Sequence, residues 1–270
     1  MATSREHRHK KTDFIEVFGK NPNAIVIRDE KGIDVQGPKS KLLKFPKVLC
    51  HSCNTTKSQP FDYAYDTFIK YIQKNRDQII KNGEIDFKEI FPDNSDKQKQ
   101  NVLRYYIKHI CCRLASNDIS INQEIIDFLN GKGNLQNIYI KFEIRMDLVF
   151  WIERLKKRTA DPGNLYISPL SYFTKSKGSD EIEVVYGFYT YRWLKMLYFY
   201  SDKMIENNYP GYTKYNLSTT IPVQALYIID PNKYETLTDD ELSAEITSAR
   251  DNYSDNNLIK DNLGTNPFME

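Results

Sequence analysis

The chain is short of the features that mark secreted and membrane-spanning proteins. Only four of its 270 residues are cysteine, and they stand in two tight pairs, unlike the disulfide framework of a small secreted domain. No apolar run approaches the ~20 residues of a transmembrane helix, and the basic N-terminus lacks the apolar stretch of a signal peptide. We therefore expect a protein of a reducing compartment, the cytoplasm, with no membrane partner.

The chain does have a large apolar content and an uneven distribution of charge. Hydrophobic residues make up 40% of the sequence and aromatic residues 13%, which is enough for a sizeable folded core. Residues 1–60 carry 12 lysines and arginines against 6 acidic residues, whereas residues 231–270 carry 3 against 9. A basic N-terminal segment is typical of a protein that binds a polyanion.

The spacing of apolar residues changes along the chain and predicts an α+β protein. Over 61–72 and 102–114 they recur every three or four positions, as on one face of a helix. Over 138–145 they alternate with polar residues, and 182–189 is also strand-like. The aromatic segment 191–200 fits a buried helix or a strand, and periodicity alone does not decide between them.

A polar break and the acidic C-terminus divide these elements into modules. The segment 91–100, FPDNSDKQKQ, separates the first predicted helix from the second. We predict a small N-terminal module over 1–90, a larger mixed α/β module over 91–230, and an acidic, flexible tail over 231–270.

Two short segments carry the residues of a candidate catalytic site. The first is the pair Glu6–His7, and the second is CHSCN at 50–54, followed by Lys57. A carboxylate binds a hard cation, and an imidazole can accept a proton near neutral pH. Together these segments resemble the HNH nucleases, the ββα-metal fold, over residues 4–66.

The resemblance implies a role for each matching residue. His7 would be the general base, and Glu6 and Asn54 would ligate one Mg²⁺ or Mn²⁺. Cys50 and Cys53 would ligate a structural Zn²⁺, but only half of a site is present, because the family places a second C-x-x-C shortly before the acid–histidine pair. The basic residues expected to contact the phosphate backbone of the substrate are Arg5, Arg8, Lys10, Lys11 and Lys57.

Two further residues are expected near the site, and one position departs from the family pattern. His9 would neighbour the substrate or the ligands, and Asp62 would help to orient them. The family commonly has an asparagine in the strand before the C-x-x-C segment, where it orients the catalytic histidine. That place is taken here by about Phe45, so either a backbone carbonyl orients His7 or activity is reduced.

The resemblance implies an endonuclease that hydrolyses phosphodiester bonds in DNA, as in bacterial restriction or anti-phage defence. One alternative is a nucleic-acid-binding module that keeps the C-x-x-C segment without catalysis. Another is an interaction protein whose aromatic-rich C-terminal half contacts a protein partner, a contact that is compatible with the nuclease hypothesis too.

Overall fold

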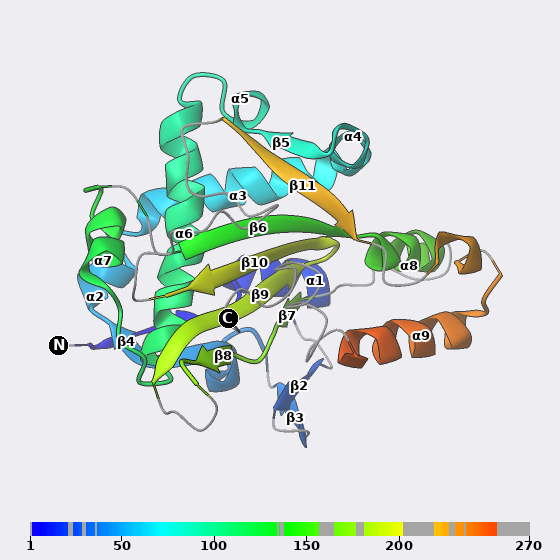
Figure 1. Cartoon of the computed structure of the whole chain (residues 1–270), viewed down its shortest axis with the longest axis horizontal. Helices are drawn as coiled ribbons and strands as arrows, with labels where there is room; N and C mark the ends of the chain where they lie inside the picture. The colour runs from blue at the N-terminus through cyan, green and yellow to red at the C-terminus, as the bar shows by residue number, and fades with distance from the viewer. Residues whose placement is uncertain are drawn as a thin grey trace. The chain divides into compact units, whose positions relative to one another are not determined.

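The computed structural model describes residues 2–20, 24–28, 31–35, 37–133, 135, 138–156, 165–176, 181–201, 219–226, 230–234 and 236–252. The chain divides into two compact units and passes between them three times. The first unit comprises residues 1–76 and 86–135, and the second comprises residues 77–85 and 136–270. Their helices and strands are labelled in Figure 1 and confirm the predicted α+β class.

The first unit begins with a pair of short antiparallel strands that carries the candidate site. β1 (Ser4–His7) pairs with β4 (Lys44–Leu49), and the short helix α2 (His51–Asn54) follows β4 directly. Strand, strand and helix are the elements that the HNH resemblance implies, although many folds share this coarse feature. The elements between β1 and β4 are α1 (Lys11–Phe18), β2 (Ala24–Arg28), β3 (Lys31–Val35) and a 3-10 turn (Lys41–Leu43).

Strand β4 bulges where it passes the acid–histidine pair. The register leaves two β4 residues, Phe45 and Pro46, opposite a single β1 residue, Glu6. Proline has no N–H to donate to a strand ladder, and bulges are among the few places in a sheet that accept it. A bulge bends the strand and re-aims nearby side chains. Glu6 and His7 therefore lie where the regular alternation of the ladder is broken.

Helices α3 (Gln59–Lys74) and α6 (Ser95–Ala115) pack against each other in the first unit. The ring of Tyr65 on α3 stacks on the ring of Tyr105 on α6, with centroids 3.7 Å apart, and Phe68 and Ile107 are fully buried. Both helices cover segments where apolar residues recur at helical spacing, so these two predictions are confirmed. Two shorter helices of this unit are α5 (Phe87–Ile90) and α7 (Gln123–Leu129).

The predicted boundary at residue 90 does not separate the compact units. α6 and α7 belong to the first unit, because the apolar face of α6 is buried against α3. Residues 77–85 belong instead to the second unit, to whose sheet they contribute most of β5 (Glu84–Asp86). The polar segment 91–100 thus marks the start of a helix and not a domain boundary.

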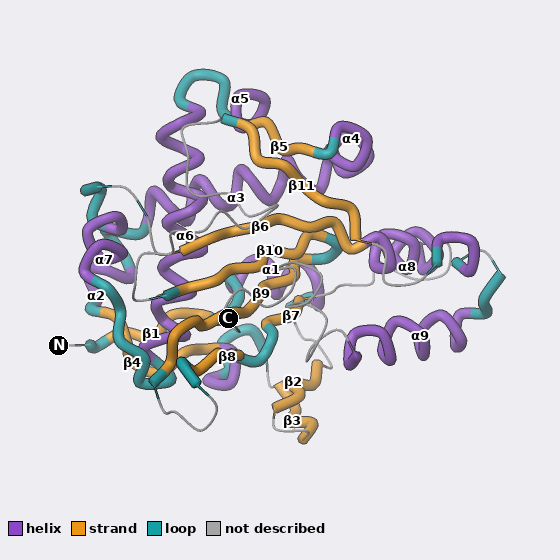
Figure 2. Tube along the Cα trace, in the orientation of Figure 1, coloured by secondary structure: helices purple, strands orange, loops and turns teal. Residues whose placement is uncertain are grey.

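The strands described in the second unit form one mixed sheet (Figure 2). Their order is β5-β11-β6-β10-β9-β7, with β8 also paired to β9. β11 runs parallel to β6, whereas β10 is antiparallel to both β6 and β9. The bounds are β6 (Ile138–Arg145), β7 (Leu165–Ile167), β8 (Ser171–Thr174), β9 (Ile182–Tyr191), β10 (Leu194–Tyr200) and β11 (Thr220–Leu226).

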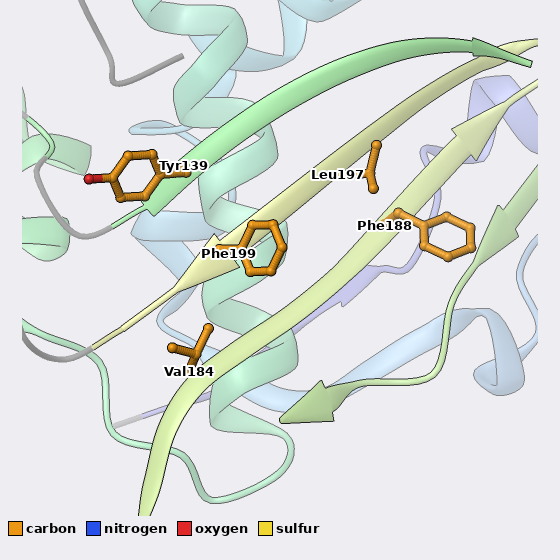
Figure 3. Packing of buried hydrophobic residues seen from close by; sticks show 5 residues of the cluster. All are labelled: Tyr139, Val184, Phe188, Leu197 and Phe199. Carbon is orange, nitrogen blue, oxygen red and sulfur yellow. The ribbon is translucent and has the colours of Figure 1, made fainter. Parts of the chain in front are cut away.

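The segment 191–200, for which periodicity allowed a helix or a strand, is strand. β10 follows β9 after a tight turn at Arg192 and Trp193, and Arg192 adopts a left-handed backbone with φ of 53°. One face of these strands carries an apolar cluster in which Tyr139, Leu197, Phe199 and their neighbours pack together (Figure 3).

The same face of the sheet also buries charge. The carboxylate of Glu143 lies between two ammonium groups, 3.0 Å from Lys141 Nζ and 3.1 Å from Lys195 Nζ. Burial alone would raise the pKa of Glu143, but the charges of Lys195 and Lys141 hold it below its ordinary value. A second buried pair, Arg145 and Asp147, makes two hydrogen bonds of 2.8 and 2.6 Å.

The predicted flexible tail is folded in its first part. Helix α9 (Asp239–Asn252) starts at Asp239, whose carboxylate lies 2.7 Å from Nε of Arg154 on helix α8 (Met146–Lys156). Leu242 on α9 is fully buried. The acidic composition of this segment therefore did not indicate that one of its apolar residues belongs to the core. Residues 253–270 lie outside the described residues.

In the described part of the chain, no helix is long and apolar enough to cross a membrane.

Candidate functional site

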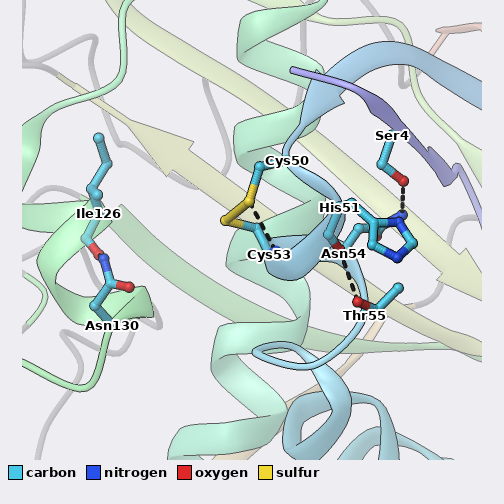
Figure 4. Close-up of a disulfide and its surroundings, with 8 residues drawn as sticks. All are labelled: Ser4, Cys50, His51, Cys53, Asn54, Thr55, Ile126 and Asn130. Carbon is cyan, nitrogen blue, oxygen red and sulfur yellow. Dashed lines mark hydrogen bonds between the residues drawn. A yellow bond between two sulfur atoms is a disulfide. The ribbon is translucent and has the colours of Figure 1, made fainter. Parts of the chain in front are cut away.

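The two predicted motif segments lie against each other in the first unit. The side-chain amide of Asn54 donates from Nδ2 to Oγ of Ser4 at 2.8 Å (Figure 4). The same nitrogen donates to the carbonyl of Arg5 at 3.2 Å. A carbonyl can only accept, so the bond to Arg5 fixes which end of the amide is nitrogen. α2 is thereby tied to β1, and the Oδ1 atom of Asn54 points away from that carbonyl.

The two polar atoms on which the nuclease hypothesis depends are both buried without a hydrogen-bond partner among the described residues. They are Oδ1 of Asn54, the predicted metal ligand, and Nε2 of His7, the predicted base. Buried polar atoms are nearly always paired, so an unpaired one needs an explanation, and a bound ion or a catalytic role is among the explanations. Oδ1 is therefore a candidate ligand and Nε2 a candidate proton acceptor.

The surroundings of the His7 imidazole favour its neutral form. The backbone of Pro38 raises the pKa of His7, but this effect is outweighed. Burial and the charges of Lys44 and Lys11 lower the pKa of His7. Phe45, at the position of the family asparagine, is fully buried.

The carboxylate of Glu6 is held at both oxygens. Oε1 accepts the backbone N–H of His7 at 3.0 Å, and Oε2 lies 3.3 Å from the ammonium of Lys108 on α6. Burial raises the pKa of Glu6, and the charge of Lys108 opposes that rise. Lys108 also lies 3.2 Å from Oδ1 of Asp62, so the predicted orienting residue does stand beside the site.

Lys108 is the functional candidate that the sequence interpretation missed. It lies in the predicted apolar helix over 102–114, next to His109, and both residues are buried. A lysine and a histidine in the middle of a largely apolar helical run are a usable signal, because buried charge requires a partner. The sequence did not indicate that the partners would be Glu6 and Asp62.

The C-x-x-C segment forms a disulfide in the structure (Figure 4). Cys50 precedes α2 and caps it, because its Sγ accepts the backbone N–H of Cys53 at 3.0 Å. Zinc binds thiolates, so these sulfur atoms could ligate it only in the reduced state. Among the described residues, no group of three or more histidine, cysteine, aspartate or glutamate side chains is placed to hold a metal.

The predicted phosphate contacts differ in their exposure. Arg5 and Lys57 are exposed, and Lys11 is half-buried. Lys10 bonds Oδ1 of Asp66 at 2.7 Å, and the guanidinium of Arg8 lies 4.8 Å from the centre of the Phe45 ring. Arg5 and Lys57 are thus the predicted contacts most open to a substrate.

His9 is placed to stay neutral. Burial, and then the positive charges of Arg113 and Arg8, lower its pKa to about 3. A neutral imidazole at physiological pH adds no charge to the site, which fits a neighbouring role better than a phosphate contact.

A buried carboxyl close to the site makes stability depend on pH. Asp13 on α1 accepts a 2.8 Å hydrogen bond from Tyr65, and burial raises its pKa from 3.8 to about 7. The folded protein therefore keeps a proton that the unfolded chain has lost between these values, and stability falls as pH rises through this window. Replacing Asp13 with Asn removes the titration and keeps an acceptor for Tyr65.

We expect the stability of Asp13→Asn relative to the parent to improve by about 2–4 kcal/mol between pH 4.5 and pH 8. Urea unfolding curves of both proteins across this range measure the difference, and subtracting them cancels every other titrating group. A difference that stays constant with pH would show that Asp13 is already ionised in the folded state at low pH.

Comparison with known proteins identifies no relative of this chain. No family model matches the chain, and neither a curated protein nor a solved structure matches it.

Proposed function

We propose that this chain is a metal-dependent endonuclease of the HNH type that hydrolyses phosphodiester bonds in DNA. The observation that carries the proposal is the pair of unpartnered buried atoms, Nε2 of His7 and Oδ1 of Asn54, on segments joined by hydrogen bonds. The residue that the resemblance names as base and one of its two named ligands thus each have a buried polar atom without a partner among the described residues.

His7 would act as the general base. Its Nε2 has no hydrogen-bond partner among the described residues, and in the neutral ring it would accept a proton from the attacking water. Phe45 cannot orient the imidazole by a side-chain hydrogen bond as the family asparagine does. Burial keeps the imidazole neutral, which is the state that a base needs.

Glu6 and Asn54 would hold a divalent cation. Both offer oxygen atoms, which Mg²⁺ and Mn²⁺ prefer, and the amide of Asn54 is fixed with its oxygen available. Such an ion, when bound, stabilises negative charge on the phosphate and the leaving oxygen. The exposed Arg5 and Lys57 would position the DNA through its phosphates without reading its sequence.

Cleavage of supercoiled plasmid tests the proposal. We expect the purified protein to nick plasmid DNA with Mg²⁺ or Mn²⁺ and to stop when EDTA is added. Asn54→Ala should cut at least about 100-fold more slowly, because a ligand and the tie to β1 are lost. Asn130→Ala, the same change at an exposed asparagine after α7, is the matched control and should cut like the parent.

A parent protein that never cuts would contradict the nuclease proposal. In that case, DNA affinity that falls steeply with salt would support the alternative of a binding module. Circular dichroism of Asn54→Ala separates lost catalysis from lost folding.

A further inference from the structure

Lys108 lies where three elements of the first unit converge on the candidate site. It is on α6, its side chain is 5% exposed, and its ammonium lies 3.3 Å from Glu6 of β1 and 3.2 Å from Asp62 of α3. The ring of Tyr105, one helical turn earlier, is 5.4 Å from the same ammonium. The lysine thus bridges two carboxylates that belong to different elements.

The packing of α6 gives no reason for a lysine at this position. Its neighbours Ile107 and Ile110 are fully buried, and an apolar residue would avoid the cost of removing an ammonium from water. That cost is offset here by two carboxylates, one of which is the proposed cation ligand. The charge of Lys108 is therefore best explained by what it does to Glu6.

We propose that Lys108 is a positioning residue that holds the Glu6 carboxylate and limits the affinity of the site for a divalent cation. The inference rests on the proposed function in one respect, the assignment of Glu6 as a cation ligand. Glu6, Asp62 and Lys108 together carry one net negative charge. Without the lysine the same place carries two, and a divalent cation is attracted more strongly.

The proposal predicts opposite effects on binding and on turnover. Lys108→Met should bind Mn²⁺ about tenfold more tightly, because the competing ammonium is gone. The same variant should cut DNA several-fold more slowly at saturating Mn²⁺, because only the backbone N–H of His7 then holds the Glu6 carboxylate. A residue that merely supports the fold would not tighten metal binding when removed.

Isothermal titration with Mn²⁺, in the absence of DNA, tests the inference on the full chain. Lys108→Arg keeps the charge and should bind Mn²⁺ like the parent. Asp62→Asn removes one negative charge and should bind it several-fold more weakly, opposite in direction to Lys108→Met. If Lys108→Met fails to fold, the Mn²⁺ affinities of the Asp62→Asn and Lys108→Arg variants still test the inference.

Unchanged or weaker Mn²⁺ binding by folded Lys108→Met would overturn the inference, as would equal shifts in Lys108→Met and Asp62→Asn. A parent that binds no Mn²⁺ would overturn it as well. The expected order of affinities in a protein that cuts no DNA would leave the role of Lys108 standing and would refute the nuclease function alone.

Discussion

Replacing His7 with alanine should slow plasmid cleavage by about 10²–10⁴-fold, which is the usual contribution of a general base to the reaction rate. The fold should persist, because His7 is only partly buried and lies at the end of a short strand. Rates measured at saturating Mg²⁺ and at saturating Mn²⁺ would show that the loss is in turnover and not in metal binding.

His51 provides the matched control for this experiment. It is an exposed histidine of α2, so His51→Ala makes the same chemical change close to the site without touching the proposed base. We expect His51→Ala to cut at the rate of the parent. A His7→Ala protein that cuts equally fast would refute the assignment of the base, even if the chain proves to be a nuclease.

The largest expected effect on stability comes from the second unit. Glu143→Gln removes the carboxylate between Lys141 and Lys195 and leaves two buried ammonium groups without it. Breaking a buried ion pair on one side typically costs about 3–5 kcal/mol, and we expect a loss of this size. Urea denaturation, followed by circular dichroism, would detect it as a lower midpoint with an unchanged slope.

A triple variant separates the charge from the packing. Lys141→Met, Glu143→Leu and Lys195→Met together remove every charge of the group at similar volume, and such replacements are often neutral or stabilising. We expect the triple variant to be more stable than Glu143→Gln. If Glu143→Gln lies within about 1 kcal/mol of the parent, the carboxylate is not compensating buried charge as the distances indicate.

The fold was predictable from the sequence where one face of an element is polar. The alternation over 138–145 identified β6, and the helical spacing over 61–72 identified α3. The segment 191–200 gave no such contrast, because β10 carries apolar or aromatic residues on both of its faces, whereas one face of β6 carries Lys141, Glu143 and Arg145. The packing of α6 on α3 joins residues far apart in the chain, and no local pattern indicates it.

The candidate site was predictable in the same uneven way. Glu6, His7 and Asn54 stand inside short motifs, so residue types and spacing suffice to name them. Lys108 lies about a hundred positions from Glu6 and reaches it only because of how α6 packs.

The path of the chain makes the two units hard to separate by truncation. Residues 77–85 leave the first unit and contribute to the second sheet, where the carbonyl of Gly83 accepts the N–H of Val223 at 2.8 Å. A fragment that starts at residue 136 would bare the edge of β11, and bare edges invite aggregation. A fragment that keeps the first unit whole is better made by replacing 77–85 with a short linker within residues 1–135 than by ending the gene at residue 76 or 90.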